Sequence, residues 1–253
     1  MKSTGSGFPA LLLHSSMSSH RQWLALVNQL SATHCCYLPD LVGYGAEPSP
    51  QTLTWSLADE ADQLLAALPC AVKEQPIDLI GHSYGGALAL HLVRTKKLTV
   101  RKLVLFEPVA FHLLAQFADA TALWQEVSGL ATALPQLPAE LAAARFTDYW
   151  QQDGFYAALP ARMRQQLASQ VVKVSLDFQA LSAEPASLAD YVSAISMQVL
   201  LLSGTHSRQS ALRICAALAN ALPVIRAVRL ECGHMGPITH PDLVNPQILS
   251  FLR

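Results

Sequence analysis

Short apolar runs alternate with amphipathic stretches along most of this chain, and this alternation is the feature that most restricts its fold. The apolar runs predict six strands, at residues 10–13, 35–38, 77–80, 102–106, 198–202 and 225–230. The amphipathic stretches predict five helices, at residues 19–31, 57–68, 84–94, 207–221 and 242–252. Short apolar strands joined by helices are typical of a parallel sheet that is buried on both faces. The pattern predicts an α/β fold: an open, mostly parallel sheet of about six strands, with helices on both faces and right-handed crossovers.

The composition is that of a single domain with a large core. The chain has 253 residues, of which 51% are hydrophobic and 14% are charged, whereas about 25% are charged in an average soluble protein. This length suits one domain with an insertion better than two full-sized domains. The net charge of −1 provides no electrostatic footprint for nucleic acid or for an anionic membrane. No apolar run approaches the ~18 residues of a membrane span, so we expect neither partner.

The cysteines and the first residues bear on the compartment. Five cysteines are scattered along the chain, and no two of them form a C-x-x-C pair. Residues 1–9 are polar and rich in glycine and serine, and the apolar run after them is too short for the core of a signal peptide. We therefore expect a cytoplasmic protein with neither a disulfide framework nor a zinc site.

The alternation is interrupted once, between residues 106 and 198. This segment is rich in alanine, leucine and glutamine, and four prolines divide it: Pro135, Pro138, Pro160 and Pro185. It predicts an inserted helical cap over residues 108–195, with a core formed by residues 1–107 and 196–253. Ten of the 18 aromatic residues fall in the insertion. They either form a small core of its own or line an apolar cavity against the sheet, and ligand pockets favour such junctions.

A serine stands in a tight turn between the third predicted strand and the following helix. The turn reads G-H-S-Y-G from Gly81 to Gly85, which is G-x-S-x-G in a strand–turn–helix context. Side chains two positions before and after Ser83 would collide in so sharp a turn, and the glycines remove that collision. The turn exposes the Ser83 hydroxyl, and the amides that begin the next helix can hold a developing oxyanion. A phosphate-binding loop is a poor alternative, because the Lys and Ser/Thr of that motif are absent. The other alternative is a plain glycine-rich turn.

With these motifs the chain resembles the α/β-hydrolase superfamily, in the serine-nucleophile, esterase- and lipase-like branch that carries a helical cap. The resemblance covers essentially the whole chain. It rests on the turn around Ser83 and on further motifs in the superfamily's order: His14-Ser15-Ser16, Trp23, D-L-V-G-Y-G from Asp40 to Gly45, and Gly233-His234-Met235. Relatives usually begin with two antiparallel strands. Nine residues leave little room for them, so we expect the sheet to be shortened to six strands.

The resemblance implies a triad in the order Ser, acid, His, and places the base after the last strand. Five histidines follow Ser83: His91, His112, His206, His234 and His240. We assign His234 as the base, because the glycines around it permit a loop that bends over the edge of the sheet. His91 lies within a predicted helix and His206 in a turn. His112 could contact a pocket, and His240 is expected to cap the final helix.

The acid does not occupy its usual place. Most relatives carry Asp after the strand that corresponds to residues 198–202, but the turn here has no carboxylate, and Ser207 stands in the expected position. Glu107 ends the fourth strand after four apolar residues, and some relatives, such as haloalkane dehalogenases, take their acid from that strand end. Burying an unpaired charge is costly. We therefore assign Glu107 as the acid that orients His234 and stabilises its imidazolium. The alternative is a structural Glu107 that accepts backbone amides.

The other carboxylates are expected elsewhere. Glu231 is only three residues before His234 and is expected to point away within the same loop. The carboxylates of the insertion are assigned to solvated helix faces: Asp119, Glu126, Glu140, Asp148, Asp153, Asp177, Glu184 and Asp190.

The oxyanion hole should use two backbone N–H groups. One is that of Tyr84, the residue after the nucleophile. By position the second is that of Ser16, with Met17 as the neighbouring possibility. Relatives usually have glycine where this chain has Ser15, so Ser15 is strained if the loop needs a positive φ there. His14 is expected to be a structural residue.

These residues predict a carboxylesterase-like serine hydrolase. It would cleave a small, fairly apolar ester, thioester or lactone through an acyl-enzyme on Ser83. A serine nucleophile argues against haloalkane dehalogenase and epoxide hydrolase chemistry, which uses Asp there in this superfamily. Carbon–carbon bond hydrolysis needs the same catalytic parts. A non-catalytic small-molecule-binding protein is the other alternative, and Ser15 and the missing Asp favour it. We expect a small acyl substrate as the partner and no cofactor, because no metal cluster or nucleotide motif is present.

Overall fold

The computed structural model describes residues 1–253 and contains a seven-stranded sheet in the order β1-β3-β2-β4-β5-β6-β7. All six predicted strands are present: β2 (Phe8–Leu13), β3 (His34–Leu38), β4 (Ile77–His82), β5 (Val100–Phe106), β6 (Gln198–Gly204) and β7 (Ile225–Leu230). These six pair with one another in parallel. The predicted α/β class, with its open and mostly parallel sheet, is confirmed.

The sheet has one strand more than the six that we expected. β1 (Lys2–Thr4) pairs antiparallel with β3, with Lys2 opposite Leu38. The chain reverses between β1 and β2 through Gly5 and Gly7, whose φ angles are +87° and +112°. The expectation was wrong because a strand of three residues and a short glycine turn fit into the available length.

Helices cover both faces of the sheet. They are η1 (His20–Trp23), α1 (Leu24–Leu30), α2 (Leu57–Ala67), α3 (Cys70–Lys73), α4 (Tyr84–Arg94), α11 (Gln209–Ala221), α12 (Gly236–Thr239) and α13 (Pro241–Leu252). Ala10 and Leu12 of β2 face a core of 17 buried residues that includes side chains of α1 and α13. Leu11 and Leu13 face a larger core of 53 buried residues with α2, α4 and α11. Burial on both faces explains why the strands are continuously apolar. None of the helices combines the length and the hydrophobicity that a bilayer crossing requires.

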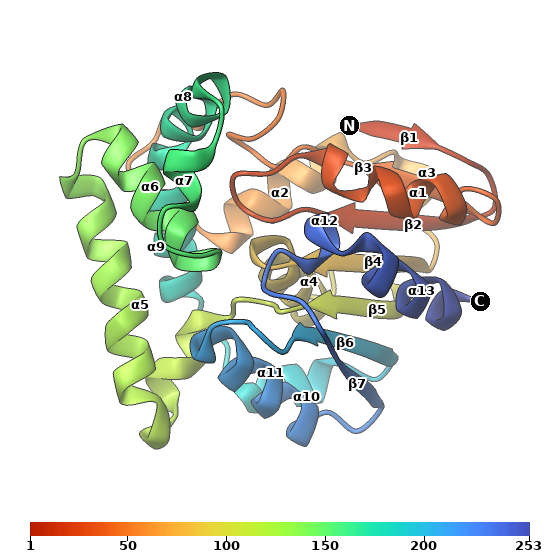
Figure 1. Cartoon of the computed structure of the whole chain (residues 1–253). Coiled ribbons are helices and arrows are strands. Elements are labelled where there is room, and N and C mark those ends of the chain that lie inside the picture. Colours follow the sequence, from red (N-terminus) through yellow and green to blue (C-terminus); the bar gives the residue numbers. More distant parts are fainter.

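The chain between β5 and β6 is helical and contains no strand. Its elements are η2 (Phe111–Gln116), η3 (Ala118–Ala120), α5 (Thr121–Ala133), η4 (Leu134–Gln136), α6 (Ala139–Trp150), α7 (Phe155–Ala158), α8 (Ala161–Ser169), α9 (Val171–Ala183) and α10 (Leu188–Ala194). Figure 1 shows α5 to α9, in green to teal, gathered beside the sheet at the end toward which the parallel strands point. α10 packs against α4 and α11. The helices α5 to α9 therefore cover the carboxyl ends of the strands, where loop residues of a parallel sheet converge.

Candidate active site

Ser83 forms the tip of the turn between β4 and α4, with φ +56° and ψ −119°. This backbone conformation is strained for a residue with a side chain. The Ser83 N–H donates to the carbonyl oxygen of Phe106 at 3.0 Å, which ties the turn to β5. A Cβ on Gly81 would lie 2.5 Å from the carbonyl oxygen of Gly85, and one on Gly85 would lie 2.5 Å from that of His14. The two glycines are therefore needed because backbone atoms fill the space beside them.

We expect Gly85→Ala to lower the free energy of unfolding by about 3 kcal/mol, the upper end of the range for overpacking. The new methyl group would meet backbone oxygens of β2 and the following loop, which cannot rotate away as a side chain can. Gly129 offers a matched control, since it is exposed on α5 and has no atom within 4 Å of an added Cβ. Gly129→Ala should raise the same free energy by up to about 1 kcal/mol. Urea denaturation measures both, and equal effects would contradict the packing argument.

Three side chains that are far apart in the sequence form a hydrogen-bonded row at the carboxyl ends of the strands. Nε2 of His234 lies 2.9 Å from Oγ of Ser83, and Nδ1 lies 2.6 Å from Oε2 of Glu107. Glu107 directly follows β5, the neighbour of β4, and the loop after β7 carries His234 from the same edge of the sheet back to the turn that follows β4. Their side chains are buried, with 6% of Ser83, 2% of His234 and none of Glu107 exposed. The structure thus brings together the three residues that the sequence singled out.

Both carboxylate oxygens of Glu107 have a hydrogen-bond donor. Oε1 accepts from the backbone N–H of Gly204 at 2.6 Å, while Oε2 faces the His234 ring. Glu107 has φ +43°, in the left-handed region that residues with side chains rarely adopt. The chain therefore turns sharply where β5 ends, and the carboxylate is fixed between β6 and the imidazole. Glu107 thus contacts the His234 ring with one oxygen and accepts a backbone amide with the other.

The alternative carboxylate, Glu231, lies away from the site. It pairs with Nε2 of His206 at 2.6 Å, and the two side chains are 72% and 67% exposed. Ser207, which stands where most relatives carry the acid, has a buried hydroxyl without a hydrogen-bond partner. The end of β6 contributes only the amide of Gly204 to the hydrogen-bonded row.

Ser15 does not carry the strain that we considered for the loop after β2. Its N–H and its hydroxyl both donate to Oε1 of Gln22, at 3.2 and 3.0 Å. The positive φ falls on Met17 instead, at +55°, because the loop turns two residues later. The N–H of Ser16 makes no hydrogen bond to the protein backbone. Tyr84 is the first residue of α4, and the N–H groups of a first helical turn have no intrahelical acceptor.

An apolar cavity of about 230 Å³ lies beside Ser83 and His234. Its walls include Phe146, Trp150 and Phe155, and no Lys, Arg, Asp or Glu lines it. A second cavity of about 10 Å³ shares Ser83 and Trp150 with the first and extends to α9. Aromatic residues of the insertion therefore do line a cavity against the sheet. Others pack among themselves, as Phe111 does with Phe178 at a ring separation of 5.9 Å.

Two contacts of His234 were not foreseen from the sequence. The indole of Trp150, at the end of α6, stacks on the imidazole with ring centroids 3.8 Å apart. His82 donates from Nε2 to the carbonyl oxygen of His234 at 2.8 Å. Burial holds the pKa of His82 well below its ordinary value, so its ring is neutral and keeps this proton on Nε2. The ring and the main chain of His234 are thus each held by a separate neighbour.

Two of the other histidines are structural. His14 donates from Nδ1 to the carbonyl of Ser15 at 2.7 Å and accepts the N–H of Leu41 on Nε2 at 2.9 Å. Burial lowers the pKa of His14 to about 4. His112 bonds to the hydroxyl of Tyr191 at 3.1 Å and lines neither cavity. Its pKa is also lowered to about 4, chiefly by burial.

Two carboxylates of the insertion are not on solvated helix faces, contrary to our expectation. Glu184 is 6% exposed and is bound by His91 at 2.8 Å and Arg94 at 2.6 Å. Asp177 is 2% exposed and forms an ion pair with Lys173, four residues earlier in α9. The assignment was wrong because this part of the insertion packs directly onto the core. The spacing of Lys173 and Asp177 in an otherwise mostly apolar helix, which puts both on one face, was an available signal.

The chain matches the model of the alpha/beta hydrolase family over residues 10–247, and it belongs to that family. It is 26% identical to a 2-hydroxymuconate semialdehyde hydrolase of Pseudomonas putida, over 98% of this chain and 88% of that protein. It is 31% identical to lipase LipV of Mycobacterium tuberculosis over 55% of this chain. It is 29% identical to a cis-3-alkyl-4-alkyloxetan-2-one decarboxylase of Shewanella oneidensis over 47% of this chain. The last two matches span only 50% and 38% of those proteins.

Solved structures agree on the fold. A thermophilic esterase from Thermogutta terrifontis superposes with a TM-score of 0.79 at 22% identity, covering 100% of this chain and 92% of that one. An enol-lactonase from Burkholderia xenovorans gives a TM-score of 0.79 at 17% identity, covering 99% and 95%. Both structures share the fold of the alpha/beta hydrolase family, to which this chain belongs.

Proposed function

We propose that the protein is a serine hydrolase that cleaves small, fairly apolar carboxylic esters through an acyl-enzyme on Ser83. The hydrogen-bonded row of Ser83, His234 and Glu107 carries the proposal. His234 takes the Ser83 proton as Oγ attacks the ester carbonyl, and Glu107 orients the ring and stabilises the imidazolium. The N–H groups of Tyr84 and Ser16 hold the oxyanion. His234 then gives its proton to the leaving alcohol, and water hydrolyses the acyl-enzyme.

The two cavities favour a neutral ester with a short acyl group. His234 lines the cavity of about 230 Å³ but not the one of about 10 Å³. The leaving alcohol takes its proton from His234, so it fits the large apolar cavity. The acyl group then extends toward the small cavity, whose volume is that of about one water molecule. An ester with a large alcohol group and a small acyl group would fit both cavities.

We expect kcat/KM to be highest for 4-nitrophenyl acetate and to fall along the propionate, hexanoate and octanoate esters. Each methylene group that a pocket cannot hold costs roughly tenfold or more. Acetate esters of progressively larger apolar alcohols form the matched series and should retain activity. Initial rates over a range of substrate concentrations measure both series. Activity that rises with acyl length and falls with alcohol length would reverse the assignment of the cavities.

Carbon–carbon bond hydrolysis is the second candidate, because the similarity to a 2-hydroxymuconate semialdehyde hydrolase extends over 98% of this chain. A muconate-type substrate carries a carboxylate, and no Lys or Arg lines the large cavity to bind it. The ester is therefore the better fit. Turnover of 2-hydroxymuconate semialdehyde at a higher kcat/KM than that of any short ester would decide for the second candidate.

Reaction with a fluorophosphonate probe separates an enzyme from a non-catalytic binding protein. We expect covalent labelling at Ser83, detected by intact mass and peptide mapping, and none in Ser83→Ala. A folded wild-type protein that resists the probe would favour the binding protein.

A further inference from the structure

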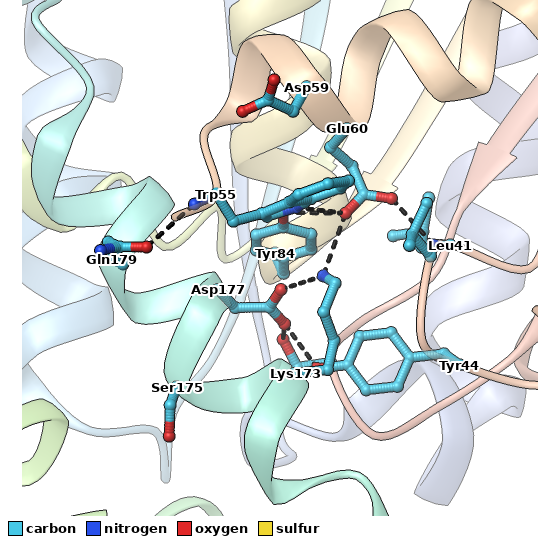
Figure 2. A network of polar contacts seen from close by, with 12 residues as sticks. Leu41, Tyr44, Trp55, Asp59, Glu60, Tyr84, Lys173, Ser175, Asp177 and Gln179 are labelled. Atoms are coloured by element: carbon cyan, nitrogen blue, oxygen red, sulfur yellow. Dashed lines mark hydrogen bonds and ion pairs between the residues drawn. The ribbon is translucent and has the colours of Figure 1, made fainter. Parts of the chain in front are cut away.

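The two residues proposed to supply the oxyanion N–H groups share a second property: the side-chain hydroxyl of each donates to the same buried ionic cluster. Tyr84 donates to Oε2 of Glu60 at 3.1 Å, and Ser16 donates to Oδ2 of Asp177 at 2.5 Å. The ammonium group of Lys173 joins the two carboxylates, at 3.0 Å from Oε2 of Glu60 and in a hydrogen bond to Oδ1 of Asp177. Figure 2 shows Lys173 between the two carboxylates, with Tyr84 beside Glu60.

We propose that this cluster of Glu60, Lys173 and Asp177 fixes the backbone of the oxyanion hole, and that Asp177 is a positioning residue for Ser16. The inference rests on the proposed function, since it assigns a role within that same site. Asp177 acts through the Ser16 hydroxyl rather than on the reacting atoms.

Each charged group of the cluster has at least two hydrogen-bond partners. Oε2 of Glu60 also accepts from Nε1 of Trp55 at 3.1 Å, and Oδ2 of Asp177 also accepts from the hydroxyl of Tyr44 at 2.5 Å. Three aromatic rings surround the Lys173 ammonium, with centroids 4.7 to 5.7 Å away: Tyr44, Tyr84 and Trp55. Buried polar networks in which every member has a partner are rigid and favour one arrangement. The anchors of the Ser16 and Tyr84 side chains are therefore well fixed.

The cluster is also strongly buried, with 0% of Lys173, 1% of Glu60 and 2% of Asp177 exposed. Burial alone would lower the pKa of Lys173, but the charges of Asp177 and Glu60 outweigh it and raise that pKa, so the ammonium remains charged. Burial raises the pKa of Asp177. Removing such charges from water offsets much of their attraction, so a buried ion cluster is weak evidence for stability alone. The hydrogen bonds that the cluster accepts from the side chains of Ser16 and Tyr84 indicate a role in the oxyanion hole in addition to any contribution to stability.

The position of the cluster matches this role. Glu60 lies on α2, Tyr84 begins α4, and Lys173 and Asp177 lie on α9 of the insertion. Ser16 lies in a loop, and its N–H shares a peptide plane with the carbonyl of Ser15, which accepts from Nδ1 of His14. The bond from the Ser16 hydroxyl to Asp177 adds an anchor on the other side of that N–H. Ser16 and Asp177 line the cavity of about 10 Å³ together with Ser83. The carboxylate therefore holds Ser16 at the wall of the space in which the carbonyl reacts.

Ser16→Ala is the most direct test, because it removes the hydroxyl and keeps the backbone N–H. We expect kcat on 4-nitrophenyl acetate to fall about tenfold with KM nearly unchanged, less than the ~10²–10³ lost when an oxyanion donor itself is removed. The affinity for a trifluoromethyl ketone, which forms a tetrahedral adduct, should fall by the same factor. Ser193→Ala is the matched control, since Ser193 is exposed and bonds only to the carbonyl of Ala189. It should leave kcat and KM unchanged.

Asp177→Asn tests whether the carboxylate acts through Ser16. We expect a loss of kcat similar to that of Ser16→Ala, and little further loss when both changes are combined. A cluster that only docks α9 onto the core would alter unfolding but not the affinity for the ketone. Equal losses from Asp177→Asn with and without the Ser16 hydroxyl would overturn the inference. If Asp177→Asn does not fold, Ser16→Ala decides alone: wild-type kcat and ketone affinity would overturn the inference.

The proposed function and the role of the ion cluster can be refuted independently of each other. A wild-type protein that turns over esters and reacts with a fluorophosphonate, combined with an unaffected Ser16→Ala, removes only the role of the cluster. A folded wild-type protein that does neither removes the proposed function, and this inference with it.

Discussion

Ser83→Ala and His234→Ala should each abolish nearly all ester turnover, with a loss of kcat on the order of 10⁶. Ser83→Ala removes the atom proposed to form the acyl-enzyme, and His234→Ala removes the base proposed to accept its proton. Because the two residues act in one step, the double variant should lose little more than either single variant. The measurement is kcat on 4-nitrophenyl acetate, with circular dichroism to establish that each variant is folded.

His240→Ala is a matched control for His234→Ala, because His240 lies on the surface six residues later in the chain. It should retain the wild-type kcat. A His234→Ala protein that keeps kcat within tenfold of the wild type would exclude His234 as the base, whatever its distance from Ser83.

Glu107→Gln should lower kcat by about 10⁴. Glutamine can still accept the N–H of Gly204 on its carbonyl oxygen, so the turn after β5 should be preserved. Its amide group would then donate to Nδ1 of His234, which forces the ring proton onto Nε2. In that tautomer Nε2 cannot accept the proton of Ser83. The loss thus arises from the wrong tautomer rather than from a displaced side chain.

Glu231→Gln provides the comparison, since Glu231 is exposed and pairs with His206 rather than with His234. We expect it to keep the kcat of the wild type. Normal turnover in Glu107→Gln together with a large loss in Glu231→Gln would show that the acid was assigned to the wrong carboxylate. Solvent-exposed pairs of this kind contribute little to stability, so unfolding of the Glu231 variant should not confuse the comparison.

The sheet could be predicted because its strands are buried on both faces and must therefore be apolar throughout. Residues 225–230 were predicted with the bounds that β7 has in the structure. β1 was missed because its three residues are exposed and polar, so no hydrophobic pattern marks them. Its pairing with β3 depends on the position of a glycine turn, which periodicity does not reveal.

The turn around Ser83 was accessible from its strand–turn–helix pattern, whereas the resemblance to the superfamily placed His234 after the last strand and supported Glu107 at the end of the fourth. Within the sheet β5 lies beside β4, but β7 is two strands beyond β5, so the loop of His234 has to reach back to Ser83. Trp150 and Asp177 were not accessible in this way, since their contacts depend on how the inserted helices pack. The strained residue of the loop after β2 was also hidden, because a positive φ at Met17 leaves no mark when the residue is not glycine.

The ion cluster has a consequence for chimaeras between members of this family. Grafting the helices of another member onto this core would remove Lys173 and Asp177 and leave Glu60 as a buried charge without its counterion. Breaking a buried pair in this way costs about 3–5 kcal/mol, a large part of the stability of a typical domain. A viable graft would therefore have to transfer or replace all three residues as one unit, although they belong to segments more than a hundred residues apart.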